Sequence, residues 1–229
     1  MHILAAVPCY EESDIVGETV QALRGITSLR DIVVIDDASS DGTARRAALS
    51  GARVVAQGEN LGKGGSLNRV LAGLDFEVLL LVDGDLGRYA SEACLLLEPV
   101  VDGVADLAIA AFPPPSNRGG FGFAQGLARW GIARLGGASM RSPLSGQRAM
   151  TRDAFSLLAP FDEGFGVEVG MTIDALRAGL RVVEVETTMS HRETARDLAG
   201  FIHRGRQFAS ILGAISRRAA RPTGRAPGR

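Results

Sequence analysis

Acidic side chains stand directly after two apolar segments of the sequence. Asp36 and Asp37 follow the first of these segments, and Asp83 and Asp85 follow the second. Carboxylates brought to one place repel one another unless a cation lies between them. A hard divalent cation that also binds phosphate oxygens is a natural partner. Asp is also a common turn residue, so the cation hypothesis requires both pairs to reach the same edge of the fold.

The spacing of Asp83 and Asp85 suggests different partners for the two carboxylates. Residues one apart in an extended chain point to opposite sides, so one carboxylate could face a ribose while the other reaches a metal. Gly84, between them, lets the backbone approach a ligand closely. The pattern is therefore typical of a site that binds both a nucleotide and a metal.

A glycine-rich stretch, residues 60–65, precedes a predicted helix. Its glycines could leave backbone N–H groups free for an anion at the helix N-terminus, and Lys63 adds a positive charge. The stretch does not match the P-loop pattern, and a simple turn is an equal alternative. No Gly-x-Gly-x-x-Gly fingerprint lies between Pro8 and Glu12, after the first apolar segment, which argues against a nicotinamide or flavin enzyme.

Two further residues could take part in chemistry. His191 follows the last predicted strand and could supply a neutral nitrogen to a metal; a surface or capping histidine is the alternative. Glu168 lies near the start of a predicted helix. It could orient or deprotonate an acceptor hydroxyl, or it could simply stabilise the helix N-terminus.

Alternating strands and helices would position these side chains. The sequence predicts a mostly parallel, doubly wound α/β sheet with helices on both faces, and ligands in such folds bind outside the carboxyl ends of the strands. Strands are predicted at 3–7, 32–35, 53–56, 78–82, 106–111 and 181–185. Helices are predicted at 14–24 with Ser13 as N-cap, and at 42–49, 64–74, 90–100, 124–135, 151–158, 167–178 and 198–215. Loops are predicted at 112–120 and 136–146.

The composition suits one globular domain, predicted over residues 1–216, with a basic and disordered tail at 217–229. The chain has 229 residues and a net charge of -1, so nothing global indicates a nucleic-acid partner. We expect no signal peptide and no membrane-spanning helix, because no apolar run approaches the roughly 20 residues that a span needs. Two cysteines without metal or disulfide spacing favour a reducing cytoplasm.

Seven segments, taken in order, resemble family 2-type glycosyltransferases with the GT-A fold. Within these they are most similar to dolichol-phosphate-mannose-synthase-like enzymes and glucosyl-3-phosphoglycerate synthases. The segments are VPCYEE (7–12), VVIDDASSDGT (33–43), NLGKGGSLN (60–68), LLLVDGDL (79–86), SPLSGQRAMTRD (142–153), GFGVEVGMTIDALRAGL (164–180) and SHRE (190–193). The resemblance implies a GT-A, Rossmann-like sheet and transfer of a sugar from a UDP- or GDP-sugar to an acceptor, with Mg²⁺ or Mn²⁺ as cofactor.

Roles for individual residues follow from the resemblance. Asp85 would be the main metal ligand, with His191 as the second. Ser145 and Gly146 would line the acceptor side, where Glu168 would act on the acceptor. The nucleotide sugar would be bound by Pro8, Tyr10, Glu12, Asp36, Asp37, Lys63, Asp83 and Gly84.

The acceptor is where this sequence departs from the family pattern. Phosphoglycerate-type members carry a Gly-Gly-Arg-x-Thr-like stretch for the acceptor's anionic groups, whereas this chain has Phe121 and Phe123 there. A lipid-linked acceptor such as a polyprenyl phosphate would suit this apolar stretch, and Arg148 could meet its phosphate. Core packing is the alternative for Phe123 and Trp130, so the acceptor stays open.

The predicted C-terminal helix is amphipathic, with an apolar stripe and several arginines. It could rest on anionic lipid, pack on the sheet, or join two copies of the chain as a homodimer. The cytoplasm and the inner face of the membrane are therefore both open as locations.

Two other functions remain to be distinguished from the glycosyltransferase. A sugar-nucleotide nucleotidylyltransferase also combines an α/β sheet with a metal, but that class opens with a glycine-rich, basic loop that the stretch from Pro8 to Glu12 lacks. A non-catalytic nucleotide-sugar-binding module would not need Lys63, Asp85 and Glu168 together. Inversion or retention at the sugar is open as well, with Glu168 as the base if the reaction inverts.

Overall fold

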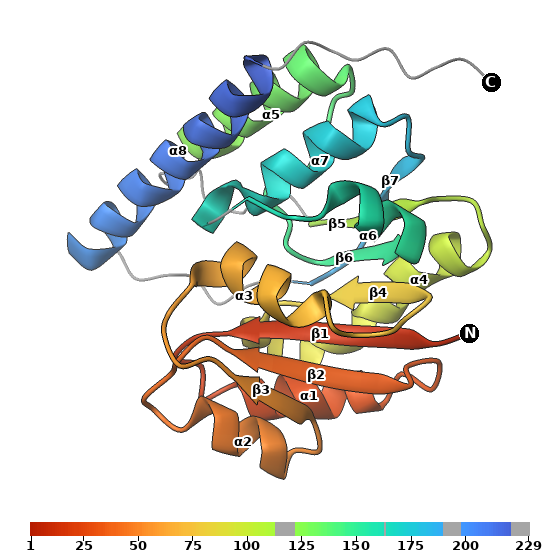
Figure 1. Cartoon of the computed structure of the whole chain (residues 1–229), viewed down its shortest axis with the longest axis vertical. Helices are drawn as coiled ribbons and strands as arrows, with labels where there is room; N and C mark the ends of the chain where they lie inside the picture. Colours follow the sequence, from red (N-terminus) through yellow and green to blue (C-terminus); the bar gives the residue numbers. More distant parts are fainter. Residues whose placement is uncertain (113–121, 163, 190–197, 221–229) are drawn as a thin grey trace.

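One seven-stranded sheet forms the centre of the molecule (Figure 1). The computed structural model describes residues 1–112, 122–162, 164–189 and 198–220. Within these ranges the strand order is β3-β2-β1-β4-β6-β5-β7. The strands are β1 Ile3–Cys9, β2 Asp31–Asp36, β3 Arg53–Ala56, β4 Val78–Leu81, β5 Leu107–Ala111, β6 Arg148–Thr151 and β7 Val182–Glu186.

The strands are parallel throughout this sheet except at β6. That strand runs antiparallel to both of its neighbours, β4 and β5. The predicted α/β class and the mostly parallel sheet are confirmed. β4 reads Val-Leu-Leu-Leu and is buried at every position, as a strand covered by helices on both faces requires.

Helices cover both faces of the sheet (Figure 1). Along β1, Ile3, Ala5 and Val7 join the apolar cluster that includes α1, α2 and α4, whereas Leu4 and Ala6 join the cluster that includes α3 and α5 to α8. This alternation is the period of two that a strand imposes. The helices are α1 Val16–Arg24, α2 Thr43–Leu49, α3 Gly62–Leu71, α4 Cys94–Val101, α5 Gly122–Gly136, α6 Arg152–Leu158, α7 Val167–Arg177 and α8 Leu198–Ala219. Two 3₁₀ segments are η1 Gly84–Ala93 and η2 Gly164–Gly166.

Three predicted details are wrong. The sequence did not predict β6, because it is only four residues long and carries an arginine. Ser13 does not cap α1: the helix begins at Val16, two residues later than predicted, and its N-cap is Ile15, whose side chain makes no cap hydrogen bond. The predicted disordered tail from 217 also begins too early, because Arg217 and Arg218 lie in the last turn of α8.

The C-terminal helix lies alongside α5 on one face of the sheet (Figure 1). A Cβ on Gly131 of α5 would overlap the side chain of Ile215 of α8, so the two helices approach closely at this point. Ile211, Ala214 and Ile215 are buried, and this half of α8 therefore packs on the protein. None of the helices in the described ranges combines the length and the apolar character needed to cross a membrane.

Candidate active site

The ends of three parallel strands bring the predicted acids to one edge of the sheet. β1 lies between β2 and β4, with Cys9 paired to Asp36 and Ala6 paired to Leu81. The Asp37 N–H donates to the Cys9 carbonyl at 2.9 Å. The segments that follow β1, β2 and β4 consequently leave the sheet at the same edge, as the sequence predicted.

Lys63 connects three elements at this edge. It lies in the first turn of α3, and its Nζ donates to Asp83 Oδ1 at 2.6 Å and to Glu168 Oε1 at 2.8 Å. The exposed fractions of the three side chains are 25%, 24% and 11%. Burial disfavours the charged amine, but the charges of Asp83 and Glu168 outweigh burial and hold the pKa of Lys63 above its ordinary value. Lys63 is therefore cationic at neutral pH and joins β4, α3 and α7.

Gln147 is a site residue that the sequence analysis did not single out. Its amide brackets Asp83: Nε2 donates to Asp83 Oδ2 at 3.0 Å, and the Asp83 N–H donates to Gln147 Oε1 at 3.0 Å. Gln147 is fully buried, just before β6. Its neighbour Gly146 is so close that a Cβ there would overlap the ends of both Asp83 and Lys63. Gln147 lies within the matching segment 142–153, which was the available signal.

Glu12 lies beside the Asp-Gly-Asp segment. A Cβ on Gly84 would overlap Glu12 Oε2 and the sulfur of Cys9, so only glycine fits at position 84. Burial raises the pKa of Glu12 to about 8, and the charges of Asp85 and Asp83 add to the rise. Glu12 Oε2 is buried, and the Cys9 thiol beside it offsets part of this rise.

These neighbouring carboxyl groups fit a divalent cation, which would favour the ionised form of Glu12. Asp85 lies in the first turn of η1, at the edge where Asp83 and Glu12 gather. The second predicted metal ligand, His191, lies outside the described residues. In the part of the chain that the structure describes, no three His, Cys, Asp or Glu side chains form a ligand set. The pairing of Asp85 with His191 therefore stays a prediction.

Asp37 holds the start of α3. Its carboxylate accepts hydrogen bonds from the N–H groups of Leu61 and Gly62, each at 2.8 Å, and from the hydroxyl of Ser66. Two amides of the predicted phosphate cradle are thus already used within the protein, which corrects that expectation. Asp37 positions Lys63 by fixing the first turn of its helix, and its nucleotide role stays a prediction.

The other predicted nucleotide residues lie at or near the same edge. Pro8 is in β1, close to its carboxyl end, and Tyr10 is exposed just beyond it. Asp36 is the last residue of β2 and is buried. Its Oδ1 lacks a hydrogen-bond partner among the described residues. No contact tests a nucleotide role for these three residues, which stays a prediction.

Arg148 and Ser145 lie beneath α7 rather than at the surface. Arg148 is buried, and it donates from Nε to the Ser145 carbonyl at 2.9 Å and from Nη1 to Thr172 Oγ1 at 3.0 Å. Burial lowers the pKa of Arg148 to about 10, against the opposing charge of Glu168, so it remains charged at neutral pH. Its burial favours an indirect role below Glu168 over the predicted contact with an acceptor phosphate.

Comparisons with known proteins agree with this arrangement. Residues 5–142 match the family model described as Glycosyl transferase family 2. Glycosyltransferase AglJ of Haloferax volcanii is 28% identical over 83% of this chain and 63% of its own length. Undecaprenyl-phosphate mannosyltransferase of Micrococcus luteus is 29% identical over 84% of this chain and 85% of its own length. The chain thus spans less than two thirds of AglJ but most of the mannosyltransferase.

A solved structure matches over most of the fold. Glucosyl-3-phosphoglycerate synthase of Mycobacterium tuberculosis, in complex with Mn²⁺, UDP and phosphoglyceric acid, superposes with a TM-score of 0.81 at 27% identity. The match covers 96% of this chain and 79% of that chain. The predicted GT-A architecture is therefore confirmed.

Proposed function

Because the chain belongs to glycosyl transferase family 2, we propose that it transfers a sugar from a nucleotide-diphosphate sugar to an acceptor. A UDP-sugar is the preferred donor and Mg²⁺ or Mn²⁺ the cofactor, by analogy with the Mn²⁺ and UDP of the mycobacterial structure. The observation that carries the proposal is the Lys63 ammonium shared by Asp83 and Glu168. This ammonium joins Asp83, which is predicted to bind the sugar donor, to Glu168, which is predicted to act on the acceptor.

The donor would bind where the carboxyl ends of β1, β2 and β4 meet. Asp85, together with His191, would hold the cation, and its charge would favour ionisation of the nearby Glu12, whose pKa is raised without it. When bound, the cation would neutralise the diphosphate and stabilise the leaving nucleotide. Lys63 adds a second positive charge, which a diphosphate could draw away from its present partners.

Glu168 is the carboxylate best placed to act on the acceptor. It lies in the first turn of α7, is mostly buried, and contacts the Lys63 ammonium at 2.8 Å. An ionised carboxylate can orient an acceptor hydroxyl and accept its proton. A phosphate acceptor would need little help from a base, and Glu168 would then mainly position it.

The decisive experiment is release of UDP or GDP from sugar donors, measured with Mn²⁺, with Mg²⁺ and with EDTA. A glycosyltransferase releases the nucleoside diphosphate in a metal-dependent way when an acceptor is present. A nucleotidylyltransferase would instead exchange pyrophosphate with the nucleotide, and a binding module would release nothing. Metal-dependent pyrophosphate exchange without UDP or GDP release would overturn the proposal.

A polyprenyl phosphate is the proposed acceptor. On α5, Phe123 and Trp130 are 84% and 59% exposed, and on the neighbouring α8, Phe208 and Leu212 are also exposed. Neither helix contains an acidic residue, whereas both contain arginines. Apolar side chains among basic ones suit a lipid that carries a phosphate, and the similarity to an undecaprenyl-phosphate mannosyltransferase supports the same class.

The acceptor and membrane proposals share one test. Transfer to a short polyprenyl phosphate and to 3-phosphoglycerate is compared for wild type and for Phe123→Ala with Trp130→Ala. We expect the variant to lose transfer to the lipid selectively and to sediment less with anionic vesicles. Unchanged transfer to the lipid in the variant would overturn the acceptor proposal, and light scattering would then test for a homodimer at this exposed face.

A further inference from the structure

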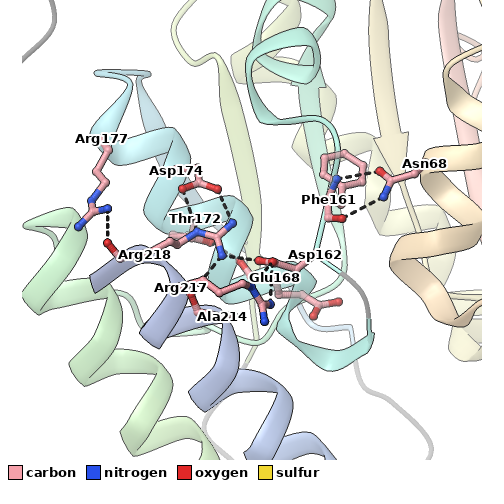
Figure 2. A network of polar contacts seen from close by, with 10 residues as sticks. All are labelled: Asn68, Phe161, Asp162, Glu168, Thr172, Asp174, Arg177, Ala214, Arg217 and Arg218. Carbon is pink, nitrogen blue, oxygen red and sulfur yellow. Dashed lines mark hydrogen bonds and ion pairs between the residues drawn. The ribbon is translucent and has the colours of Figure 1, made fainter. Parts of the chain in front are cut away.

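A second group of buried charges lies behind Glu168 and is centred on Arg218 of α8 (Figure 2). Arg218 Nε donates to Asp174 Oδ1 at 2.8 Å, and Nη2 donates to Asp174 Oδ2. Nη1 donates to Asp162 Oδ2. The Arg218 side chain is only 8% exposed. One guanidinium thus binds α7, through Asp174, and the segment before η2, through Asp162.

Asp162 belongs to the connection that leads from α6 to the start of α7. This connection is also anchored on α3. The Asn68 side chain brackets Phe161, donating to its carbonyl at 2.9 Å and accepting from its N–H at 2.7 Å (Figure 2). A Cβ on Gly64 would overlap the Asp162 carbonyl oxygen. The connection is therefore held between α3, which carries Lys63, and α8.

The end of this connection, η2, packs closely on the backbone of α8. A Cβ on Gly166 would lie 2.9 Å from the Cβ of Ala214 and 3.0 Å from the Ser210 carbonyl oxygen. Such distances leave no room for a side chain. Glu168 follows Gly166 by two residues, so a shift of η2 against α8 would move the carboxylate that contacts Lys63.

We propose that Arg218 is a positioning residue for Glu168: it locks the C-terminal helix onto the connection that sets the first turn of α7. The inference rests on the proposed function only in assigning Glu168 a part in transfer. Arg217, the residue before Arg218, also contacts Asp162, at 2.8 Å, but its side chain is about half exposed. It therefore offers a matched control.

Physical reasons favour a specific effect of Arg218. Without its guanidinium, Asp174 would lose both of these contacts and Asp162 would keep only the contact with the half-exposed Arg217 among those described. A partly buried charge that loses its partner is destabilising. The planar fork of arginine also fixes the direction of each contact, which a lysine cannot do. Release of the fork should thus loosen the connection before it unfolds the domain.

The first test is hydrogen exchange of peptides covering residues 161–170 in wild type, Arg218→Met and Arg217→Met. We expect at least fivefold faster exchange in Arg218→Met, less than a twofold change in Arg217→Met, and unchanged exchange in β1 and β2. Equal exchange in all three proteins would overturn the proposal. If Arg218→Met does not fold, Asp174→Asn, which removes the two-nitrogen contact of Arg218 with α7, replaces it and the same readings apply.

The second test asks whether Arg218 acts through Glu168. In the wild-type background, Arg218→Met should lower kcat about 10- to 100-fold with the donor KM within twofold. In a Glu168→Gln background the same substitution should change kcat by less than threefold, because the group it positions is gone. An equal loss in both backgrounds would refute the positioning role. A wild type that turns over no sugar nucleotide would refute the proposed function instead, while hydrogen exchange would still decide the role of Arg218.

Discussion

Lys63 and Arg218 each stand between two carboxylates, yet the two clusters differ in how they hold them. Lys63 offers a single ammonium to Asp83 and Glu168, and its side chain is 25% exposed, against 8% for Arg218. Arg218 offers a rigid fork, and its two nitrogens on one side bind Asp174 together. The same number of charges thus gives a point contact in one place and a fixed geometry in the other.

The difference between ammonium and guanidinium suits two different roles. The proposed function requires Lys63 to exchange a carboxylate for a phosphate, whereas Arg218 has to keep its contacts. An ammonium on a flexible stem can turn from a carboxylate to a phosphate, whereas a guanidinium held on both sides cannot move without breaking several bonds. Gly146 adds to this contrast, because its missing side chain leaves the room that Asp83 and Lys63 occupy. A ligand could therefore reorganise the Lys63 cluster while the Arg218 cluster keeps the framework in place.

The largest loss of activity is expected at Asp85, because the exchange of partners proposed for Lys63 requires a sugar donor that is bound through the metal. Asp85→Ala should lower metal-dependent turnover on the order of 100- to 1,000-fold, with the melting temperature nearly unchanged. The control is Asp102→Ala, an exposed acid at the end of α4, which should leave turnover within twofold. An active Asp85→Ala enzyme would mean that the metal site lies elsewhere.

Reciprocal substitutions test the contrast itself. Arg218→Lys loses the fork and should lower the free energy of unfolding by about 2–3 kcal/mol. Lys63→Arg keeps the charge but must fit a larger group beside Gly146, so it should lower kcat about tenfold or more while stability changes by less than about 1 kcal/mol. Urea denaturation and steady-state kinetics on both variants give the comparison. The distinction fails if the two variants lose stability and activity in the same proportion.

Two glycines, one beside each cluster, differ in the kind of atom that an added Cβ would contact. At Gly146 it would meet the ends of the Asp83 and Lys63 side chains, and at Gly64 the backbone carbonyl of Asp162. Side-chain ends can move aside, so Gly146→Ala should lower activity about tenfold and keep the fold. Gly64→Ala should cost about 1–3 kcal/mol of stability. Calorimetry measures the stability of both variants and a turnover assay their activity. A Gly64→Ala protein as stable as wild type would contradict the close packing of Gly64 on Asp162.

Much of the sheet could be predicted because its parallel strands are buried on both faces. β3 matches the predicted residues 53–56, and β4 differs by one residue. β6 was not predicted because it is short and begins with Arg148, whose buried guanidinium binds Thr172, 24 residues away in the sequence. A short strand with a buried arginine carries no periodic signal.

The site was predicted as separate residues but not as an arrangement. Asp83, Lys63 and Glu168 each stood out, yet nothing local in the sequence shows that the Lys63 ammonium joins the other two. Arg218 was assigned to a basic tail because its charge was counted without its partners. Asp162 and Asp174 precede it by 56 and 44 residues, so only the fold reveals the pairing.

The smallest expected effect comes from an exposed ion pair that serves as a reference for both clusters. Asp106 accepts hydrogen bonds from the Arg181 side chain at 2.7 and 3.1 Å and from the Arg181 N–H at 2.7 Å, and these contacts lower the pKa of Asp106. A lowered carboxyl pKa contributes stability above the unfolded value of about 4, and that contribution is lost as the pH falls through the folded value. The urea midpoint of Asp106→Asn should therefore lie slightly below that of wild type at pH 7, and the difference should shrink as the pH falls below the ordinary carboxyl pKa. Because Arg181 is largely exposed, 1 M NaCl should shrink the difference in urea midpoint between Asp106→Asn and wild type at pH 7. The loss of stability caused by Asp162→Asn, beside the buried Arg218, should persist in the same salt. A salt response of equal size at both positions would remove the distinction between a screened surface pair and a buried clamp.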